Sequence, residues 1–109
     1  MREKPSLIYR MHTLTFPIKQ RILLRVISWI LVNTGGNLND ALRYGRQSVE
    51  YEPGQSYSID TLATCYFALE EFDRAIEYER LAVRLTPYRE DIIRTLERFQ
   101  AGKAAKNGN

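Results

Sequence analysis

The stretch of the chain that decides the fold runs from Ser56 to Arg89 and reads SYSIDTLATCYFALEEFDRAIEYERLAVRLTPYR. Its apolar residues recur every three or four positions, which is the spacing that places side chains on one face of a helix. Pro53-Gly54 interrupts this spacing before the stretch, and Pro87 interrupts it at the end. The same spacing continues outward in both directions. It predicts an all-α fold with helices at about 17–34, 38–52, 56–69, 72–85 and 88–101.

The helical pattern repeats along the chain. Ala75 follows Ala41 at an interval of 34, and Pro87 follows Pro53 at the same interval. In the helices that precede these residues the interval is 35, and one extra residue in the turn at Gly35-Gly36 accounts for the difference. Further pairs at the shorter interval are Leu38 with Phe72, Tyr44 with Tyr78 and Val49 with Val83, and the pairs at the longer interval are Leu24 with Ile59, Ile27 with Leu62, Ser28 with Ala63 and Leu31 with Tyr66.

The second repeat unit, residues 56–89, resembles the tetratricopeptide repeat family, whose helix–turn–helix unit has this period. The first unit, about 21–55, matches less closely, and the resemblance extends over about 21–103, with an end like that of many bacterial members. It implies an α-solenoid of two tetratricopeptide hairpins plus a C-terminal capping helix. The matching positions are Ile59, Leu62, Ala63, Tyr66, Phe72, Ala75, Ala82 and Pro87 in the second unit, and Leu24, Ile27, Ser28, Leu31, Leu38, Ala41, Ser48 and Pro53 in the first.

These units define one domain at 17–102, with a capping helix at about 88–101 and a flexible polar tail at 103–109. Glu97 and Gln100 are polar at positions where the earlier units carry residues that pack against a following helix. No further helix is therefore expected to pack there.

The N-terminal arm, residues 1–16, has no counterpart in the repeats. The helix that follows it is apolar on several sides, more than one buried stripe requires. We expect the surplus to be covered by the arm, by self-association, or by upstream repeats if the chain is a fragment.

The small number of reactive side chains argues against an enzyme, a metal site or a cofactor. Cys65 is the single cysteine and lies among apolar helix positions, which indicates a buried structural thiol. His12 is the single histidine and lacks the spacing of a ligand or a base. The carboxylates that could be suspected of acid–base work are expected to be solvated or capping rather than paired; they are Asp60, Glu70, Glu71 and Asp73.

The charge is distributed unevenly. Residues 1–35 carry six basic and one acidic side chain, residues 36–87 five and nine, and residues 88–109 five and three. Basic ends of this kind are compatible with nucleic-acid or acidic-membrane binding, although a solvated surface explains them more simply. The apolar run Ile22–Val32 contains Arg25 and is shorter than the roughly 20 residues that a membrane span needs. We expect a cytoplasmic protein without a transmembrane segment.

The family resemblance implies a concave groove, lined by the first helix of each hairpin, that holds an extended peptide or a partner helix. Trp29 and Thr64 stand where chaperone-binding members have asparagines, and Asp60 stands where they have a lysine, so their carboxylate clamp is not carried over. Trp29 has the alternative of packing against the arm. By the register above, the expected groove residues are Arg25, Trp29, Asp60, Thr64, Phe67, Arg94 and Arg98.

The sequence therefore predicts a protein–protein interaction module rather than an enzyme. Arg94 and Arg98 share one helix face, and Arg25 is expected at the other end of the groove, which favours an acidic segment with an aromatic or aliphatic anchor. Asp60 has the alternative of neutralising one of these arginines. The alternative function is nucleic-acid or acidic-membrane binding through the basic termini, of which nucleic acid is the less favoured.

Overall fold

The computed structural model describes the backbone of residues 18–108 and the side chains from Ile22 onward. His12, Pro17 and the arm at 1–16 lie outside the described residues. The described chain contains helices and no strand, which confirms the all-α prediction. The helices are α2 (Ile18–Asn33), α3 (Leu38–Tyr51), α4 (Ser56–Ala68), α5 (Phe72–Leu85) and α6 (Glu90–Gly108).

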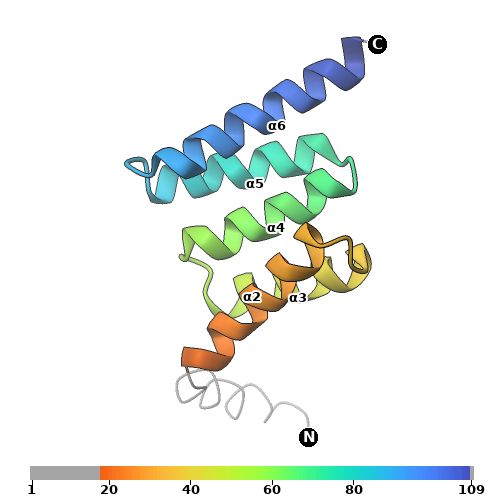
Figure 1. Ribbon diagram of the computed structural model, residues 1–109. Helices are drawn as coiled ribbons and strands as arrows, with labels where there is room; N and C mark the ends of the chain where they lie inside the picture. Colours follow the sequence, from red (N-terminus) through yellow and green to blue (C-terminus); the bar gives the residue numbers. More distant parts are fainter. Residues whose placement is uncertain (1–17, 109) are drawn as a thin grey trace, which may run out of the picture.

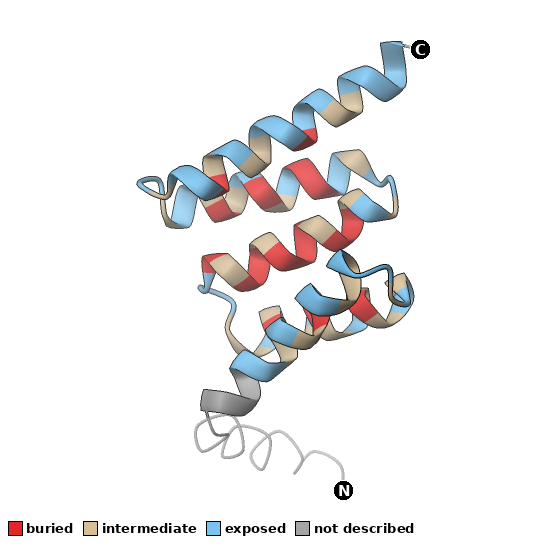
Figure 2. Cartoon of the chain, in the orientation of Figure 1, coloured by how far each residue is buried: buried red, intermediate tan, exposed pale blue. Residues whose placement is uncertain are grey.

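Each helix packs against the next one in the chain, and α2 also contacts α4. The helices are stacked in one direction, with α2 and α3 at one end and α6 at the other (Figure 1). The central position belongs to α4, which contributes more buried residues than any other described helix (Figure 2). Its position explains why the Ser56–Arg89 stretch carries the clearest sequence signal.

The turns that close α2 and α4 have the same backbone geometry, and they recur at the longer of the two repeat intervals. Gly35 and Glu70 both adopt the left-handed conformation, with φ of 76° and 62°. Glycine adopts this conformation without strain, whereas a residue with a Cβ atom adopts it at some cost. In each turn one amide closes the helix end across five residues: Gly36 N–H donates to Leu31 O at 2.9 Å, and Glu71 N–H donates to Tyr66 O at 2.9 Å.

The extra residue of the first unit lies at this turn, as the spacing predicts. Glu71 closes α4 and is also the residue that precedes the first turn of α5. In the first unit two neighbouring residues have these roles: Gly36 closes α2, and Asn37 caps α3. The Asn37 side chain accepts a hydrogen bond from the Asp40 amide at 2.9 Å, as expected of an N-cap.

The turns after α3 and α5 are likewise equivalent, and they recur at the shorter interval. Glu52 and Thr86 share φ of −138° and ψ of 71°, and the amide of each donates to the carbonyl four residues earlier. The sequence period is therefore also a period of backbone geometry. Gln55 caps α4, since its side chain accepts a hydrogen bond from the Tyr57 amide, and Ser56 is buried in the first helical turn.

Close helix packing depends on small residues at the predicted positions. Ala41, Ala63, Ala75 and Ala82 have no exposed surface. Gly45 also lies at a close approach, since a Cβ atom there would stand 3.1 Å from the Ser28 hydroxyl oxygen. These contacts allow the helix axes to approach where larger side chains would separate them.

The apolar core continues from α4 and α5 into α6. Phe99 of α6 is fully buried and stacks on Phe67 of α4, with 4.5 Å between the ring centroids. Glu97 and Gln100 of α6 are exposed. The sequence analysis did not single out Phe99, although it follows the buried Cys65 at the shorter repeat interval.

The final helix is longer than predicted. The residues from 103 to 108, expected to form a flexible tail, continue α6. Two ion pairs join this extension to the start of α5: Lys103 to Asp73 at 2.6 Å, and Lys106 to Glu70 at 3.0 Å. Composition predicted fraying there because it does not reveal these two partners. No helix of the described chain has the length and apolarity to cross a membrane.

Candidate binding groove

A groove of about 480 Å³ lies between α2, α4 and the start of α6. Three residues predicted from the sequence, Arg25, Trp29 and Asp60, line it together. The Trp29 side chain is 54% exposed, so it offers apolar surface to a ligand rather than filling the core. The complete lining consists of Arg25, Val26, Trp29, Tyr57, Asp60, Thr61 and Asp91.

The other four predicted residues do not line this groove. The Thr64 hydroxyl donates to the Asp60 carbonyl in its own helix at 2.9 Å. Phe67 is half-buried in the core contact with Phe99. Arg94 is exposed and pairs with Glu90 at 3.1 Å. Each of these three residues is thus engaged in a contact within the chain.

Arg98 is the fourth of these residues. Its guanidinium carbon lies 5.4 Å from the ring centroid of Phe67 and 5.1 Å from that of Phe99. Such cation–π contacts hold the side chain over the core of α4 and α6. The groove therefore does not bring Arg25, Arg94 and Arg98 together, and of these three arginines it contains only Arg25.

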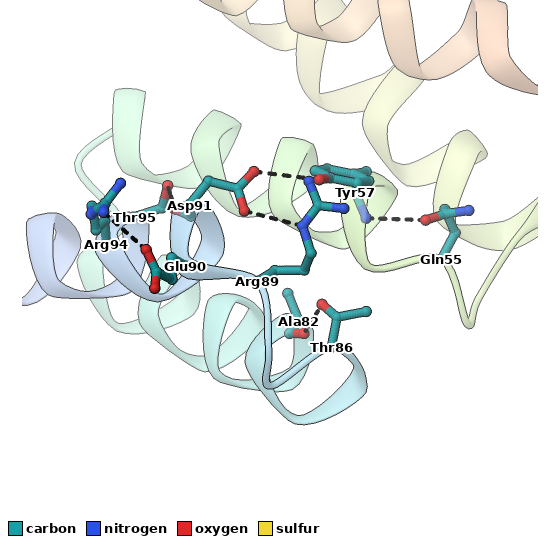
Figure 3. A network of polar contacts seen from close by, with 9 residues as sticks. All are labelled: Gln55, Tyr57, Ala82, Thr86, Arg89, Glu90, Asp91, Arg94 and Thr95. Atoms are coloured by element: carbon teal, nitrogen blue, oxygen red, sulfur yellow. Dashed lines mark hydrogen bonds and ion pairs between the residues drawn. The ribbon is translucent and has the colours of Figure 1, made fainter.

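Tyr57 and Asp91, which the sequence analysis did not single out, line the groove and are joined by a hydrogen bond (Figure 3). The Tyr57 hydroxyl donates to Asp91 Oδ2 at 3.4 Å, and Arg89 Nε donates to Asp91 Oδ1 at 3.4 Å. Two guanidiniums lie over the Tyr57 ring, those of Arg89 at 4.7 Å and Arg25 at 5.9 Å. This network joins α4 to the start of α6 across the groove.

A buried carboxyl group lies behind Asp60. Glu79 of α5 has no exposed surface, and neither carboxyl oxygen receives a hydrogen bond from the described residues. Burial, followed by the hydrogen bond with Asp60 and the negative charge of Asp60, raises the pKa of Glu79 to about 10. With this pKa, Glu79 is protonated at neutral pH.

Burial also raises the pKa of Asp60, while the hydrogen bond from Glu79 and the charge of Arg98 act in the opposite direction. The expectation that Asp60 is solvated and unpaired was wrong, because Asp60 is half-buried and its carboxyl interacts with that of Glu79. The expectation holds for Glu70, Glu71 and Asp73, which are exposed and form ion pairs with basic residues rather than with another carboxyl group.

A signal for Glu79 was present in the sequence. It lies four residues after Ala75 and three before Ala82, and this spacing places it on the buried face of α5. Its counterpart in the first unit is Gly45, which is buried as well. The sequence analysis did not recognise that an ionisable residue lies on this buried helix face.

The groove is continuous with an exposed apolar face of α2. Val26 and Trp29 belong to both, and the face also includes Ile22, Leu23 and Ile30. These residues are between 37% and 54% exposed, which is unusual for large apolar side chains gathered on one helix. The surplus of apolar residues predicted for this helix is therefore present on its surface.

Cys65 is fully buried, as predicted, and burial raises the pKa of its thiol. Its sulfur lies 3.4 Å from the Ser28 hydroxyl, whose proton is donated to the Ala41 carbonyl at 2.7 Å. A thiol in this environment is poorly suited to act as a nucleophile.

Within residues 18–108, no group of three or more histidine, cysteine or carboxylate side chains is arranged to hold a metal ion. The groove instead offers an aromatic wall, an arginine and a carboxylate. Comparison with known proteins gives no matching family model and no match among curated protein sequences.

Proposed function

We propose that the chain is a protein–protein interaction module of the tetratricopeptide type, in which the groove between α2, α4 and α6 holds an extended segment or a helix of a partner protein. The repeated turn geometry supports the family assignment, because the turns after α3 and α5 recur at the interval of 34 that the family resemblance implies, and the turns after α2 and α4 recur at that interval plus the one extra residue. In this proposal the module acts as a scaffold and carries out no reaction.

The single observation that carries the binding role is Trp29. A large aromatic side chain, half exposed at the edge of a groove and continuous with further apolar surface, has the properties of an interface anchor. Partners can gain apolar burial from Trp29 without a rearrangement of the core.

The test is affinity capture of partners with Trp29→Ala beside the unchanged chain. Tyr88→Ala is a matched control, since Tyr88 is 76% exposed and does not line the groove. The proposal predicts that Trp29→Ala loses the captured proteins while Tyr88→Ala retains them. Equal capture by both variants, each shown by circular dichroism to be folded, would contradict the role of the groove.

The alternative, nucleic-acid or acidic-membrane binding, has less support. Of the five basic residues between positions 88 and 109, Lys103, Lys106, Arg89 and Arg94 form ion pairs with carboxylates, which reduces the charge available to a polyanion. The basic residues before position 18 lie outside the described residues.

A further inference from the structure

The exposed apolar face of α2 has an equivalent in α4 that is buried. At the interval of 35 that relates the two helices, Leu23 corresponds to Ser58 and Ile30 corresponds to Cys65. Leu23 and Ile30 are 50% and 46% exposed, whereas Ser58 and Cys65 have no exposed surface. The exposed face of α2 is therefore a face that the fold buries in the next unit.

In α4 and α6 this face is covered by the helix that comes before it in the chain. Ser48 of α3 donates a hydrogen bond to the Ser58 hydroxyl of α4 at 2.7 Å. One unit later, Ala82 of α5 and Ile92 of α6 stand at the same two positions and belong to one buried cluster. The cover is thus the second helix of the preceding unit, and for α2 such a helix would come from the residues before it.

Those residues carry the pattern of such a helix. Carried back by the interval of 35, α3 corresponds to residues 3–16, for which the sequence analysis found no counterpart. Small residues recur at the buried positions, and apolar or aromatic residues recur beside them. The matching sets in the arm, α3 and α5 are Ser6, Ala41 and Ala75; Leu7, Leu42 and Ile76; Tyr9, Tyr44 and Tyr78; Thr13, Ser48 and Ala82; and Leu14, Val49 and Val83.

Two residues of the arm depart from this pattern. Glu3 stands where α3 and α5 have an apolar residue. Arg10 stands at the position that already differs between the described units, where α3 has Gly45 and α5 has Glu79. Neither departure falls at a position of the matching sets.

On this basis we propose that residues 3–16 form a helix that packs on the exposed face of α2, in the position that α3 takes on α4. Pro17 separates the two segments, because a proline disfavours the helical conformation in the residue before it. The connection is shorter than the one between α3 and α4, since α2 already begins at Ile18. The inference does not rest on the proposed function.

The arm is favoured over a second copy of the chain as the cover of this face. α2 carries three basic and no acidic side chains, so pairing two copies of α2 would bring like charges together, whereas residues 3–16 carry two basic side chains and one acidic side chain. The arm is also joined to α2, which gives it the effective concentration of a tethered ligand, on the order of millimolar.

The arrangement predicts specific neighbours. Thr13 should lie against Leu23, as Ser48 lies against Ser58 in the next unit. Thr15 should point to solvent, because the equivalent residues of α3 and α5 are both exposed. A segment without a fixed place on α2 would bring both threonines near Leu23 equally often.

The experiment places cysteine pairs in the full chain and measures disulfide formation by exchange with oxidised glutathione. The test pair is Thr13→Cys with Leu23→Cys, and the control pair is Thr15→Cys with Leu23→Cys. The buried Cys65 is left in place, and mass spectrometry identifies the linked residues. We expect the test pair to form a disulfide within one chain, with an equilibrium constant at least about tenfold larger than that of the control pair. Equal constants for the two pairs, no disulfide in the test pair, or a disulfide between two copies would overturn the inference.

Hydrogen exchange provides a second measurement that needs no added cysteine. In the full chain the backbone amides of the arm should exchange at least about tenfold more slowly than those of an unstructured segment. Leu23→Asp should abolish this protection, because it places a charge beneath the arm, whereas Leu85→Asp, at another half-exposed leucine, should preserve it. Unprotected exchange throughout the arm, or protection that survives Leu23→Asp, contradicts the proposed packing.

Discussion

Replacing Glu79 by glutamine should make the protein more stable, and the gain should grow with pH. In the folded chain the Glu79 pKa is raised to about 10 from an ordinary value of 4.5. The folded state therefore keeps a proton that the unfolded chain releases, and stability is lost as pH rises from 4.5 toward 10. Below 4.5 both states hold the proton and the penalty disappears.

The magnitude follows from the proton difference between the two states. One proton held by the folded state and not by the unfolded state changes the free energy of unfolding by about 1.4 kcal/mol per pH unit. Between pH 5 and 8 this amounts to a loss on the order of 4 kcal/mol at most. Glutamine has nearly the same shape and does not titrate. The free energy of unfolding of Glu79→Gln should therefore not show this decrease with pH.

The assay is urea unfolding followed by far-ultraviolet circular dichroism at pH 5, 6, 7 and 8. The difference in unfolding free energy between Glu79→Gln and the unchanged chain should increase steadily with pH, and taking this difference cancels the contribution of titrating groups that do not interact with Glu79. Glu77→Gln, exposed on the same helix, should show a constant difference near zero. A difference that stays constant for Glu79→Gln as well would refute the buried, protonated state of this residue.

The remaining predictions concern packing and assembly. Ala75→Leu should lower the free energy of unfolding by about 1–3 kcal/mol, since Ala75 has no exposed surface, and an unchanged urea midpoint would count against this contact. Phe99→Ala should cost about 3–5 kcal/mol through the cavity left against Phe67, whereas Gln100→Ala on the exposed side should leave the midpoint unchanged. Light scattering of the full chain and of residues 17–109 should differ if the arm at 1–16 covers the apolar face of α2; equal monomeric mass and equal stability would show that this face needs no cover.

The helices and their order were predictable from the sequence because they depend on local signals. Apolar spacing, the Pro53 and Pro87 breaks and the glycines at the α2–α3 turn act over a few residues, and all of them appear at the expected places. The small residues at the helix contacts could also be predicted, because each position has an equivalent in the other repeat unit. A departure from the predicted helices, the extension of α6, depends on Lys103 and Lys106 meeting carboxylates that lie far away in the sequence.

The groove was predictable only in part, for a different reason. The repeat register placed Arg25, Trp29 and Asp60 on the helices that line the groove. It does not show whether a given side chain faces solvent or packs into the core. Phe67 and Arg98 were assigned to the groove and lie instead in stacking contacts with Phe99. Whether such a side chain lines the groove or packs into the core depends on the side chains of the next helix.

The two repeat units show how one backbone can carry two different sites. Their turns and small-residue contacts agree, yet the buried position that is Gly45 in the first unit is Glu79 in the second. Gly45 permits a close contact with Ser28 and Leu62, whereas Glu79 places a proton next to the groove-lining Asp60. Because the backbone does not change between the copies, the difference resides in this side chain. The two units therefore differ in polarity at this position although their backbones agree.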